Sequence, residues 1–266
     1  MRLIATGLSG TIGRKLDQDI RPAQVVLGTD KLSDYFDKSA APVSLIHLGG
    51  IVGEAKVSLD LSYSKQINVD ETLRLAREVI EDFKGRFIHI STSHVYGSEL
   101  SKLSEKSSYN PQTNYAMQKM LAEKSLLDYF GENHPGLVIL RVFSVLGWDM
   151  PNFTLGGAVK RILSGSNESI ANSGDIRDFM TPTSIAKAIS IIAKDSPISG
   201  VYNLCTGTGI TVGEAARSMF RIKKFQERPD QIQLDKSNAP QIVGDNTKII
   251  STRLDLDLKW DPESDL

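Results

Sequence analysis

The chain has 266 residues, of which 40% are hydrophobic and 24% charged, the composition of a soluble globular protein of one or two domains with a large buried core. Its formal net charge is -1 and it has no basic block, which argues against a nucleic acid or a membrane surface as the main partner. The start of the chain lacks the apolar stretch of a signal peptide, and no run approaches the roughly 20 apolar residues of a membrane span, so we expect a cytoplasmic protein.

Short apolar runs alternate with longer helical patterns in the first half of the chain. Apolar spacing predicts strands at 3–6, 25–27, 43–48, 86–90 and 137–142, and helices at 12–20, 64–82 and 113–130. This alternation predicts an α/β fold in which a doubly wound parallel sheet carries helices on both faces.

The second half is less regular. Its pattern predicts helices at 153–163, 183–193 and 211–220, a strand at 200–204, and polar loops at 165–175 and 226–244. No linker separates two units, so a second domain would be built from excursions of the C-terminal half. We therefore expect a main domain over residues 1–150, to which 180–205 returns, and a small lobe formed by 151–179 and 206–266.

Residues suited to bind a metal are few and scattered. The single cysteine, Cys205, excludes an intrachain disulfide and a cysteine-rich site. The four histidines show no metal-ligand spacing. The sequence therefore predicts no metal centre.

Three glycines follow the first expected strand and open the first expected helix. Gly7, Gly10 and Gly13 would allow a tight turn, the close approach of a pyrophosphate and close helix–strand packing, with free N–H groups facing the phosphates. The spacing is Gly-x-x-Gly-x-x-Gly, and its strand–turn–helix context favours a dinucleotide over a purely structural turn. The predicted cofactor contacts in this turn are Gly7, Ser9, Gly10, Thr11, Ile12 and Gly13.

An acidic residue follows the second expected strand. Asp30 lies 17 residues past Gly13, where a carboxylate can accept hydrogen bonds from the adenosine ribose hydroxyls. Such a carboxylate would repel a 2′-phosphate, so NAD is favoured over NADP. Lys31 follows at once and keeps NADP open, and an ordinary turn aspartate is the other interpretation.

Tyr115 and Lys119 are four residues apart in a run of good helix formers. Helical spacing places them on one face, and a nearby ammonium would lower the pKa of the phenol from about 10. The phenol would then be able to transfer protons near neutral pH. Alone, the pair is equally compatible with a tyrosine at the core edge and a lysine in solvent.

A hydroxyl-rich segment, Ser91-Thr92-Ser93, follows the strand at 86–90. Ligands of open α/β sheets bind at the carboxyl ends of strands, so a hydroxyl there can hydrogen-bond a substrate hydroxyl or ketone. Thr92 precedes Tyr115 by 23 residues, which leaves room for a loop and the start of the next helix.

These motifs, taken in order, resemble the extended short-chain dehydrogenase/reductases of the NAD-dependent epimerase/dehydratase group. The resemblance covers nearly the whole chain and implies a Rossmann-like fold. Beyond the glycine turn, Thr92 and the Tyr115–Lys119 pair, it is carried by Ile46-His47-Leu48-Gly49-Gly50, Asn68-Val69, Ser93-His94-Val95-Tyr96-Gly97, Leu140-Arg141-Val142-Phe143-Ser144-Val145-Leu146-Gly147, Gly174-Asp175-Ile176-Arg177-Asp178-Phe179, Val201-Tyr202-Asn203-Leu204, Asp245-Asn246-Thr247-Lys248 and Trp260-Asp261-Pro262.

The resemblance implies roles by position. Tyr115 would be the acid/base at a carbinol or ketone, Lys119 would lower its pKa and hold the nicotinamide ribose, and Thr92 would orient the substrate oxygen. Members of the group mostly act on nucleoside-diphosphate sugars, and Arg177 matches an arginine that often meets the substrate diphosphate. The alternative for Arg177 is an ion pair with Asp175 or Asp178. Further cofactor contacts are implied at Leu48, Gly49 and Gly50.

Three departures from the group's pattern narrow the reaction. Ser93 and His94 stand where the dehydratases have Asp-Glu, which argues against dehydration. His94 also stands where the sugar 3,5-epimerase/reductases have a cysteine; its ring could act as an acid or base or shape the pocket. Ser144 replaces an asparagine of many 4-epimerases. Ser93, His94 and Ser144 join Thr92 and Arg177 as predicted substrate contacts.

The chain is also short for the group. The stretch between Asp30 and Val43 leaves little room for the usual third strand, so we expect the sheet to lack it and the substrate-binding lobe to be small. Relatives often dimerise through the helices that correspond to 64–82 and 113–130, which implies a homodimer.

Three functions fit these observations. A reductase of a 4-keto nucleotide sugar is favoured by Ser144 and by the small lobe. A nucleotide-sugar 4-epimerase with bound NAD also fits the missing Asp-Glu pair. A non-catalytic dinucleotide-binding sensor would need the glycine turn but not Thr92, Tyr115 and Lys119, so the three residues in register argue against it.

Overall fold

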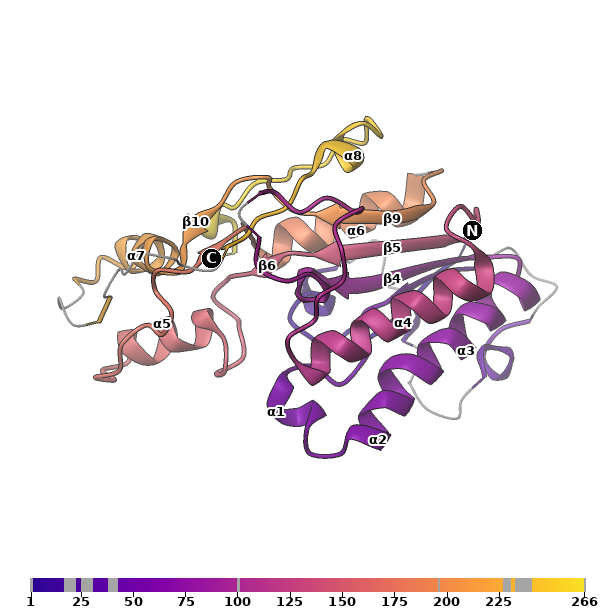
Figure 1. Ribbon diagram of the computed structural model, residues 1–266, viewed down its shortest axis with the longest axis horizontal. Coiled ribbons are helices and arrows are strands. Elements are labelled where there is room, and N and C mark those ends of the chain that lie inside the picture. Colours follow the sequence, from indigo (N-terminus) through magenta and orange to yellow (C-terminus); the bar gives the residue numbers. More distant parts are fainter. Residues whose placement is uncertain are drawn as a thin grey trace.

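The computed structural model of the chain describes residues 2–16, 23–24, 31–37, 43–99, 101–195, 197–226, 231–232 and 241–265. Its centre is a six-stranded sheet in the order β2-β1-β3-β4-β5-β9, with every neighbouring pair parallel (Figure 1). The strands are β1 (Arg2–Thr6), β2 (Ala23–Gln24), β3 (Val43–His47), β4 (Arg86–Thr92), β5 (Leu137–Val142) and β9 (Gly200–Leu204). The predicted Rossmann-like α/β fold is confirmed.

The central strands are buried along their whole length. Every residue of β3, β5 and β9 is buried, as expected for a parallel sheet covered on both faces. Side chains alternate between the two faces, so Ile88 of β4 enters one core and Phe87 enters the other. The near-continuous apolar runs in the sequence have this cause.

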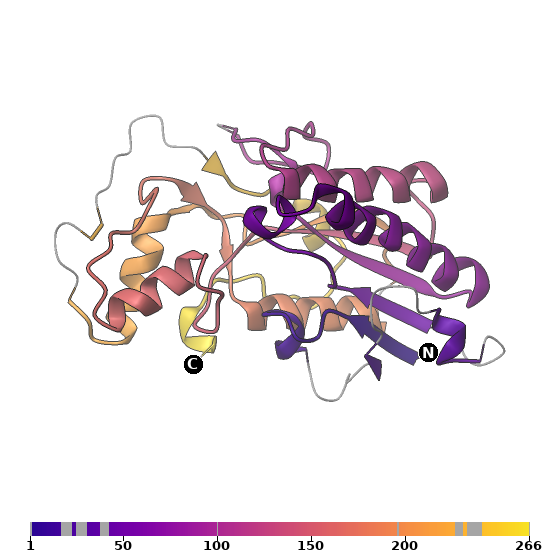
Figure 2. The same ribbon diagram turned by 90° about the horizontal axis from the view of Figure 1, so that it is seen from below.

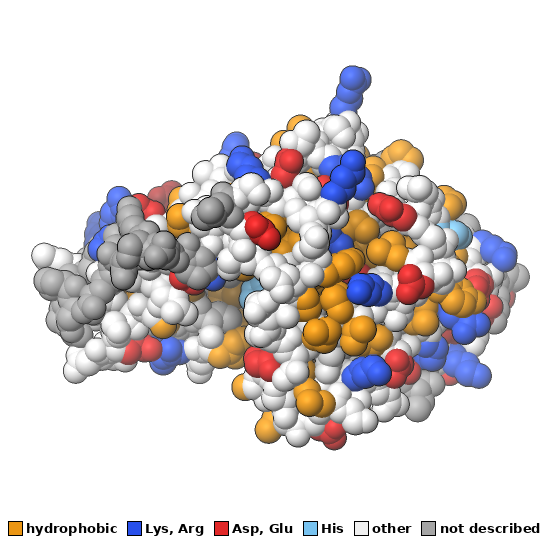
Figure 3. Space-filling view, viewed as in Figure 1, with side chains coloured by type: hydrophobic (Ala, Val, Ile, Leu, Met, Phe, Trp, Pro, Cys, Tyr) orange, Lys and Arg blue, Asp and Glu red, His pale blue; other side chains and the backbone are white. Residues whose placement is uncertain are grey.

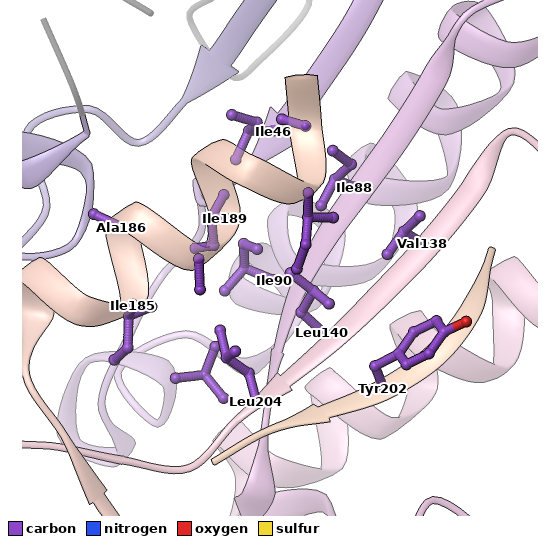
Figure 4. Close-up of a cluster of buried hydrophobic side chains, with 14 of the residues drawn as sticks. Ile46, Ile88, Ile90, Val138, Leu140, Ile185, Ala186, Ile189, Tyr202 and Leu204 are labelled. Carbon is purple, nitrogen blue, oxygen red and sulfur yellow. The ribbon is translucent and has the colours of Figure 1, made fainter. Parts of the chain in front are cut away.

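Helices cover the two faces of the sheet, as Figure 2 shows from below. One face carries α6 (Pro182–Asp195), whose Ile185, Ala186 and Ile189 pack on Ile88, Ile90 and other strand residues (Figure 4). The other face carries α4 (Asn114–Phe130) and a helical run from Leu61 to Asp82. That run contains α2 (Leu61–Lys65) and α3 (Glu71–Arg77), each followed by a π-helical turn, Gln66–Asp70 and Glu78–Asp82.

Local signals fix the ends of these helices. Asp60 caps α2 by accepting a hydrogen bond from the Tyr63 N–H, and Thr113 caps α4 by accepting one from the Ala116 N–H. Gly131, with φ at 83°, ends α4. The predicted helices at 64–82 and 113–130 therefore exist, the first beginning three residues earlier.

A smaller lobe lies beyond the carboxyl ends of the strands (Figure 1). It holds α5 (Leu155–Leu163) and α7 (Val212–Ile222), which pack on each other through a cluster that includes Val159, Met219 and Phe220. Its strands form a three-stranded sheet, β10 (Ile210–Thr211), β7 (Ile176–Arg177) and β11 (Gln241–Ile242), and a pair, β6 (Ser144–Val145) with β8 (Phe179–Met180).

The C-terminal segment returns to the main sheet. Ile249 of α8 (Thr247–Ile250) joins the core under α6, and Leu254, Leu256 and Leu258 pack against that core. Short helices complete the described chain: α1 (Glu54–Val57) and the 3-10 turns Gly13–Lys15, Leu32–Asp34, Ser93–Val95 and Pro262–Asp265.

Two expected elements at the N-terminus lie partly or wholly outside the described residues. The described part of the predicted helix at 12–20 is the 3-10 turn Gly13–Lys15, which ends at Leu16 with ψ at 133°, and glycines at 10 and 13 disfavour an α-helix there. Residues 17–20 of that prediction lie outside the described residues. The predicted strand at 25–27 lies outside the described residues. Between β2 and β3 the described residues 31–37 form a 3-10 turn, and β2 is the edge strand of the sheet among the described residues. The other residues of this stretch, 25–30 and 38–42, lie outside the described chain, so the loss of the third strand stays a prediction.

Within the described residues, no helix combines the length and the apolar character needed to cross a membrane. The same part of the chain holds no group of three or more His, Cys, Asp or Glu side chains arranged to bind a metal ion.

Candidate active site

One cleft collects most of the residues singled out from the sequence. It has a volume of about 610 Å³ and opens at the carboxyl ends of β1, β3, β4 and β5, the edge where open α/β sheets bind ligands. The predicted residues that line it are Gly7, Ser9, Gly10, Thr11, Ile12, Gly13, Leu48, Gly49, Gly50, Thr92, Tyr115 and Lys119. Sequence reasoning missed the opposite wall, which includes Met150, Pro151, Phe153 and Thr154 of the lobe.

The three glycines of the turn have different neighbours. A Cβ on Gly13 would lie 2.4 Å from the Gly7 carbonyl oxygen, and one on Gly7 would lie 2.7 Å from the Gly49 nitrogen. Gly7 also has φ at 75°, which favours glycine. Among the described residues, a Cβ on Gly10 would meet only the Gly7 oxygen, at 3.2 Å. Gly7 and Gly13 are therefore needed for packing, whereas Gly10 leaves space on the cleft side.

The turn also leaves backbone donors free. Gly10 N–H is used inside the turn, by the Gly7 oxygen at 3.0 Å, but Thr11 and Ile12 N–H make no hydrogen bond within the described part of the chain. Free amides beside an open glycine bind phosphate oxygens well, so the turn fits the diphosphate of a dinucleotide. Asp30, predicted to contact the ribose, lies outside the described residues.

Buried side chains hold the second wall of the cleft, residues 48–51, in place. Thr6 Oγ1 accepts a hydrogen bond from Gly49 N–H at 2.9 Å. The Asn68 amide bonds both the N–H and the carbonyl of Ile51, at 2.8 Å and 3.0 Å, and donates to Gln118 Oε1 at 2.9 Å. This wall is thereby tied to β1, to the helical run from Leu61 and to α4.

Tyr115 and Lys119 lie in the first turns of α4 and both reach the cleft. Lys119 is 8% exposed; its Nζ donates to the Ile90 carbonyl oxygen at 2.7 Å and lies 3.2 Å from His89 Nε2. Desolvation lowers the pKa of Lys119 to about 8, although the charge of Glu123 acts in the other direction.

The predicted lowering of the Tyr115 pKa is wrong for this structure. Tyr115 is half-buried, and desolvation of its phenolate raises its pKa to about 12. Lys119 points its ammonium at His89 and Ile90 and is itself poorly solvated, so helical spacing alone does not make it an effective partner of the phenol. The phenol is therefore protonated at neutral pH.

The segment after β4 places its three polar residues differently. Thr92 lines the cleft, and its Oγ1 accepts from the His94 N–H at 3.2 Å, which leaves the hydroxyl proton available. Ser93 is 1% exposed, and its Oγ has no partner among the described residues. His94 remains accessible to solvent; desolvation and the charge of Arg177 lower its pKa.

Arg177 pairs with one of the two carboxylates expected from the sequence. Its Nη2 lies 2.7 Å from Asp175 Oδ2, with the side chains 20% and 17% exposed. Asp178 is instead buried and accepts from Thr206 and Gly207 N–H, each at 2.9 Å. Arg177 does not line the cleft described above, but its charge acts on His94.

Ser144 also lies away from the cofactor end of the cleft. It belongs to β6, and its N–H donates to the Asp178 carbonyl oxygen at 2.9 Å. This bond places Ser144 beside the β7–β8 segment that carries Arg177.

Sequence reasoning missed a buried ion pair behind Thr92. Arg141 of β5 lies 2.7 Å from Glu123 of α4, with the two side chains 3% and 0% exposed. Glu123 also accepts from Ser91 Oγ and from the Tyr109 hydroxyl, and Arg141 donates to the Tyr96 hydroxyl at 2.6 Å. An arginine inside an apolar strand and a glutamate four residues after Lys119 were the available signals.

Comparison with known proteins identifies the family. The model of the NAD dependent epimerase/dehydratase family matches residues 23–205. The GDP-6-deoxy-D-mannose reductase of Pseudomonas aeruginosa is 24% identical, with 98% of this chain and 92% of the relative aligned. The GDP-6-deoxy-D-talose 4-dehydrogenase of Aggregatibacter actinomycetemcomitans is 23% identical, with coverages of 94% and 90%.

Solved structures agree on the fold. A structure of RMD from Pseudomonas aeruginosa complexed with NADPH superposes with a TM-score of 0.82 at 21% identity, over 99% of this chain and 94% of that one. The family match covers well over half of the chain and includes β3, β4, the Tyr115–Lys119 pair and β9. The chain therefore belongs to the NAD-dependent epimerase/dehydratase family of extended short-chain dehydrogenase/reductases, as its ordered motifs predict.

Proposed function

We propose that the chain is an NAD(P)-dependent oxidoreductase that reduces the 4-keto group of a nucleoside-diphosphate sugar. The observation that carries the proposal is the single cleft in which the glycine turn meets Thr92, Tyr115 and Lys119. The relatives support it, since two that align over nearly their whole length are named for a reductase and a 4-dehydrogenase of GDP-6-deoxy sugars.

The cofactor would be held at the turn end of the cleft. The free N–H groups of Thr11 and Ile12 would bind its diphosphate, and Lys119 would contact its nicotinamide ribose. When bound, the nicotinamide supplies the hydride. Asp30 favours NAD, whereas the structural neighbour described above holds NADPH, so both dinucleotides belong in the test.

The side chains of the cleft supply the proton and the orientation. Tyr115, whose raised pKa keeps its phenol protonated, would donate a proton to the ketone oxygen. Thr92 would donate its free hydroxyl proton to the same oxygen and so orient the sugar. A phenol poised as an acid suits reduction better than the oxidation that begins an epimerase cycle.

The substrate would extend from Thr92 toward the lobe. His94 and Arg177 would form the next part of its site, with the substrate diphosphate competing with Asp175 for the guanidinium. Ser93 and Ser144 would complete the sugar site through the backbone of the two segments that carry them. On this proposal residues 1–150 and 180–205 bind the cofactor, and 151–179 with 206–266 form the substrate lobe. Two segments depart from these bounds, since β6 pairs with β8 in the lobe and Ile249 of α8 packs in the main core.

A homodimer through the helical run from Leu61 to Asp82, which contains the expected helix at 64–82, and through α4 is part of the proposal. Leu61, Tyr63 and Met117 on these helices are 50%, 55% and 42% exposed, and hydrophobic side chains gather over this face in Figure 3. Light scattering should give the mass of two chains, and a monomeric mass would refute this assembly.

A cytoplasmic location fits an enzyme of nucleotide sugars, and fractionation of the source cells would test it.

A substrate screen tests the proposed function. Purified protein would be mixed with nucleotide sugars, including 4-keto-6-deoxy forms, and NADH or NADPH, with nicotinamide absorbance and product identity followed together. Stoichiometric cofactor consumption with one keto sugar supports the reductase. Interconversion of sugars without added cofactor would identify a 4-epimerase instead, and dinucleotide binding without turnover would favour a sensor.

A further inference from the structure

A buried histidine lies directly behind Lys119. His89 of β4 is 0% exposed, and its Nε2 is 3.2 Å from Lys119 Nζ. The Ile90 carbonyl oxygen, on the next residue of the strand, accepts a second bond from the same ammonium at 2.7 Å. Two adjacent residues of β4, His89 and Ile90, therefore both accept hydrogen bonds from the Lys119 ammonium.

The donor and acceptor roles at His89 follow from its partner. An ammonium has only protons to offer, so His89 Nε2 must accept. A neutral imidazole then carries its proton on Nδ1. Desolvation, with the charges of Lys119 and His47, lowers the pKa of His89 well below its ordinary value, which agrees with the neutral form.

The neighbouring imidazole is also neutral, and its tautomer is fixed. Thr72 Oγ1 donates to the Asn68 carbonyl oxygen, so it must accept from His47 Nε2, 3.0 Å away. His47 Nδ1 then accepts from Thr6 Oγ1 at 2.8 Å. His47 stacks on His89 with ring centroids 5.6 Å apart, so His89 lies in a fixed position between this bonded ring and the lysine.

The second ring nitrogen of His89, Nδ1, is in an unfavourable environment. His89 Nδ1 is buried and has no hydrogen-bond partner among the described residues. An N–H group in this state costs stability, and an apolar side chain of similar size would avoid that cost. Within the part of the chain that the structure describes, the only hydrogen bond that His89 makes in return is the one to Lys119.

We infer that His89 is a positioning residue that holds the Lys119 ammonium at the floor of the cofactor cleft through its Nε2. The inference rests on the role proposed for Lys119 and deepens it. Without this acceptor the ammonium would retain the Ile90 oxygen alone and could turn away from the place proposed for the nicotinamide ribose.

The charged and titratable groups around Lys119 come from three elements. On α4 these are Glu123, one turn further along the helix, and Tyr115, one turn before. On β4 the group is His89, and on β3 it is His47, whose pKa burial and the charge of Lys119 lower to about 3. Both histidines stay neutral over the working range, so changes there act on Lys119 through hydrogen bonding.

Three replacements separate positioning from packing. His89→Gln can place an amide oxygen close to the position of Nε2, His89→Asn has the same chemistry but is one methylene shorter, and His89→Leu fills the space without an acceptor. Each full-length variant would be measured for thermal stability, NADH affinity by nicotinamide fluorescence, and the pH dependence of Lys119 acylation by mass spectrometry.

We expect His89→Leu and His89→Asn to lose about tenfold in NADH affinity, the scale of one hydrogen bond to a charged group, and to lower the Lys119 pKa. His89→Gln should restore most of both. His89→Leu gains stability by removing the unpaired Nδ1–H and loses stability with the bond to the ammonium, so its melting temperature should stay close to that of the parent. A purely structural histidine would show the reverse, with stability lost and Lys119 unaffected.

Any of three results would overturn the inference. The first is that Lys119 titration and NADH affinity in His89→Leu equal those of the parent, and the second is that His89→Gln restores neither quantity. The third is that His89→Leu and His89→Gln both lose enough stability to account for their weaker NADH binding. None of these readouts needs a sugar. If the parent protein turns over no nucleotide sugar, the proposed reaction fails while acylation and NADH binding still decide the role of His89.

Discussion

Glu54 accepts a hydrogen bond from the backbone N–H of Tyr115, with 3.0 Å between Oε2 and N. Its other oxygen accepts from Asn114 Nδ2 and from Ser58 Oγ, both at 2.8 Å. Glu54 opens α1, three residues after the cleft wall at residues 48–51. The carboxylate therefore fastens the start of α4, and with it the proposed acid, to the cofactor side of the cleft.

Replacing Glu54 with alanine should loosen this end of α4. We expect the free energy of unfolding to fall by about 1 kcal/mol, the usual cost of a lost helix cap, and kcat to fall several-fold. The hydrogen bonds lower the pKa of Glu54, so its stabilising effect is present above the pKa of the unfolded chain and is lost as pH falls through the folded value. Urea melts at neutral and acidic pH measure this.

Ser58→Ala is the matched control for that experiment, since it removes one bond to Glu54 and leaves the contact with Tyr115 intact. It should keep kcat near the parent value. Equal loss of kcat in the two variants would mean that Glu54 acts through α1 alone and does not position Tyr115.

Replacing Tyr115 with phenylalanine tests the proposed acid. We expect turnover of the keto sugar to fall by about 100- to 10,000-fold, the usual contribution of general acid catalysis, because the ring remains and only the proton donor is lost. NADH affinity should hardly change. Steady-state kinetics and nicotinamide fluorescence measure the two quantities. Turnover equal to that of the parent would refute the acid role.

The pH dependence of reduction should follow Lys119 and not Tyr115. Lys119 carries its proton below its lowered pKa of about 8, and Tyr115 keeps its proton up to about 12. Rates should therefore be flat near neutral pH and fall as pH rises through about 8. In Lys119→Arg, whose guanidinium stays charged, any remaining activity should lose that alkaline limb. An unchanged limb in that variant would assign it to another group.

The limits of prediction from the sequence can be traced to particular residues. The strands β3 and β5 were predicted within one residue, because runs such as Leu137–Val142 are apolar along their whole length. The helix predicted at 113–130 likewise agrees with α4, which begins after the Thr113 cap. The lobe strands, such as Ile210–Thr211, have two residues each and show no periodicity, so only tertiary pairing reveals them.

The residues of the candidate site could likewise be predicted from the sequence only in part. The ordered motifs, through the family that they resemble, grouped Thr92, Tyr115 and Lys119, and all three line one cleft. The motifs could not show that desolvation dominates at Tyr115, since burial depends on the surrounding chain. Nor could they pair His89 with Lys119, because a single polar residue in a buried strand gives no indication of what it faces.

The glycine turn offers a matched pair of substitutions. Gly13→Ala should destabilise the protein, because its Cβ would lie 2.4 Å from the Gly7 oxygen and 2.7 Å from Leu8 Cα. Gly10→Ala should keep the fold, since its Cβ meets one atom of the described chain, the Gly7 oxygen, at 3.2 Å. It should still weaken NADH and NADPH binding, as the methyl would occupy the space proposed for the diphosphate. Thermal melts and fluorescence titrations separate the two effects.

Either of two results would contradict these expectations for the glycine turn. If Gly10→Ala binds both dinucleotides as well as the parent does, the diphosphate does not lie against this turn. If Gly13→Ala melts at the parent temperature, the close contact with Gly7 relaxes more easily than the geometry indicates.

Removing one partner of the Arg141–Glu123 pair should lower the stability of the protein more than removing both. Arg141→Met leaves the Glu123 carboxylate buried without its counter-ion, and loss of one partner of a buried pair typically costs about 3–5 kcal/mol. Desolvation alone would lower the pKa of Arg141, but the charge and hydrogen bonds of Glu123 raise it overall, so the arginine stays charged. Glu123→Gln should also be destabilised, to a smaller degree, because its amide can still bond Tyr109.

The double variant Arg141→Met/Glu123→Leu should recover much of that stability, since both buried charges are then absent. A double-mutant cycle from urea melts gives the coupling. Turnover need not recover with stability, because Ser91 loses its bond to Glu123 and the adjacent Thr92 is then less firmly held. If the two single variants lower the free energy of unfolding additively, water already screens the Arg141–Glu123 pair. If the double variant recovers full turnover, Ser91 does not need Glu123 to position Thr92.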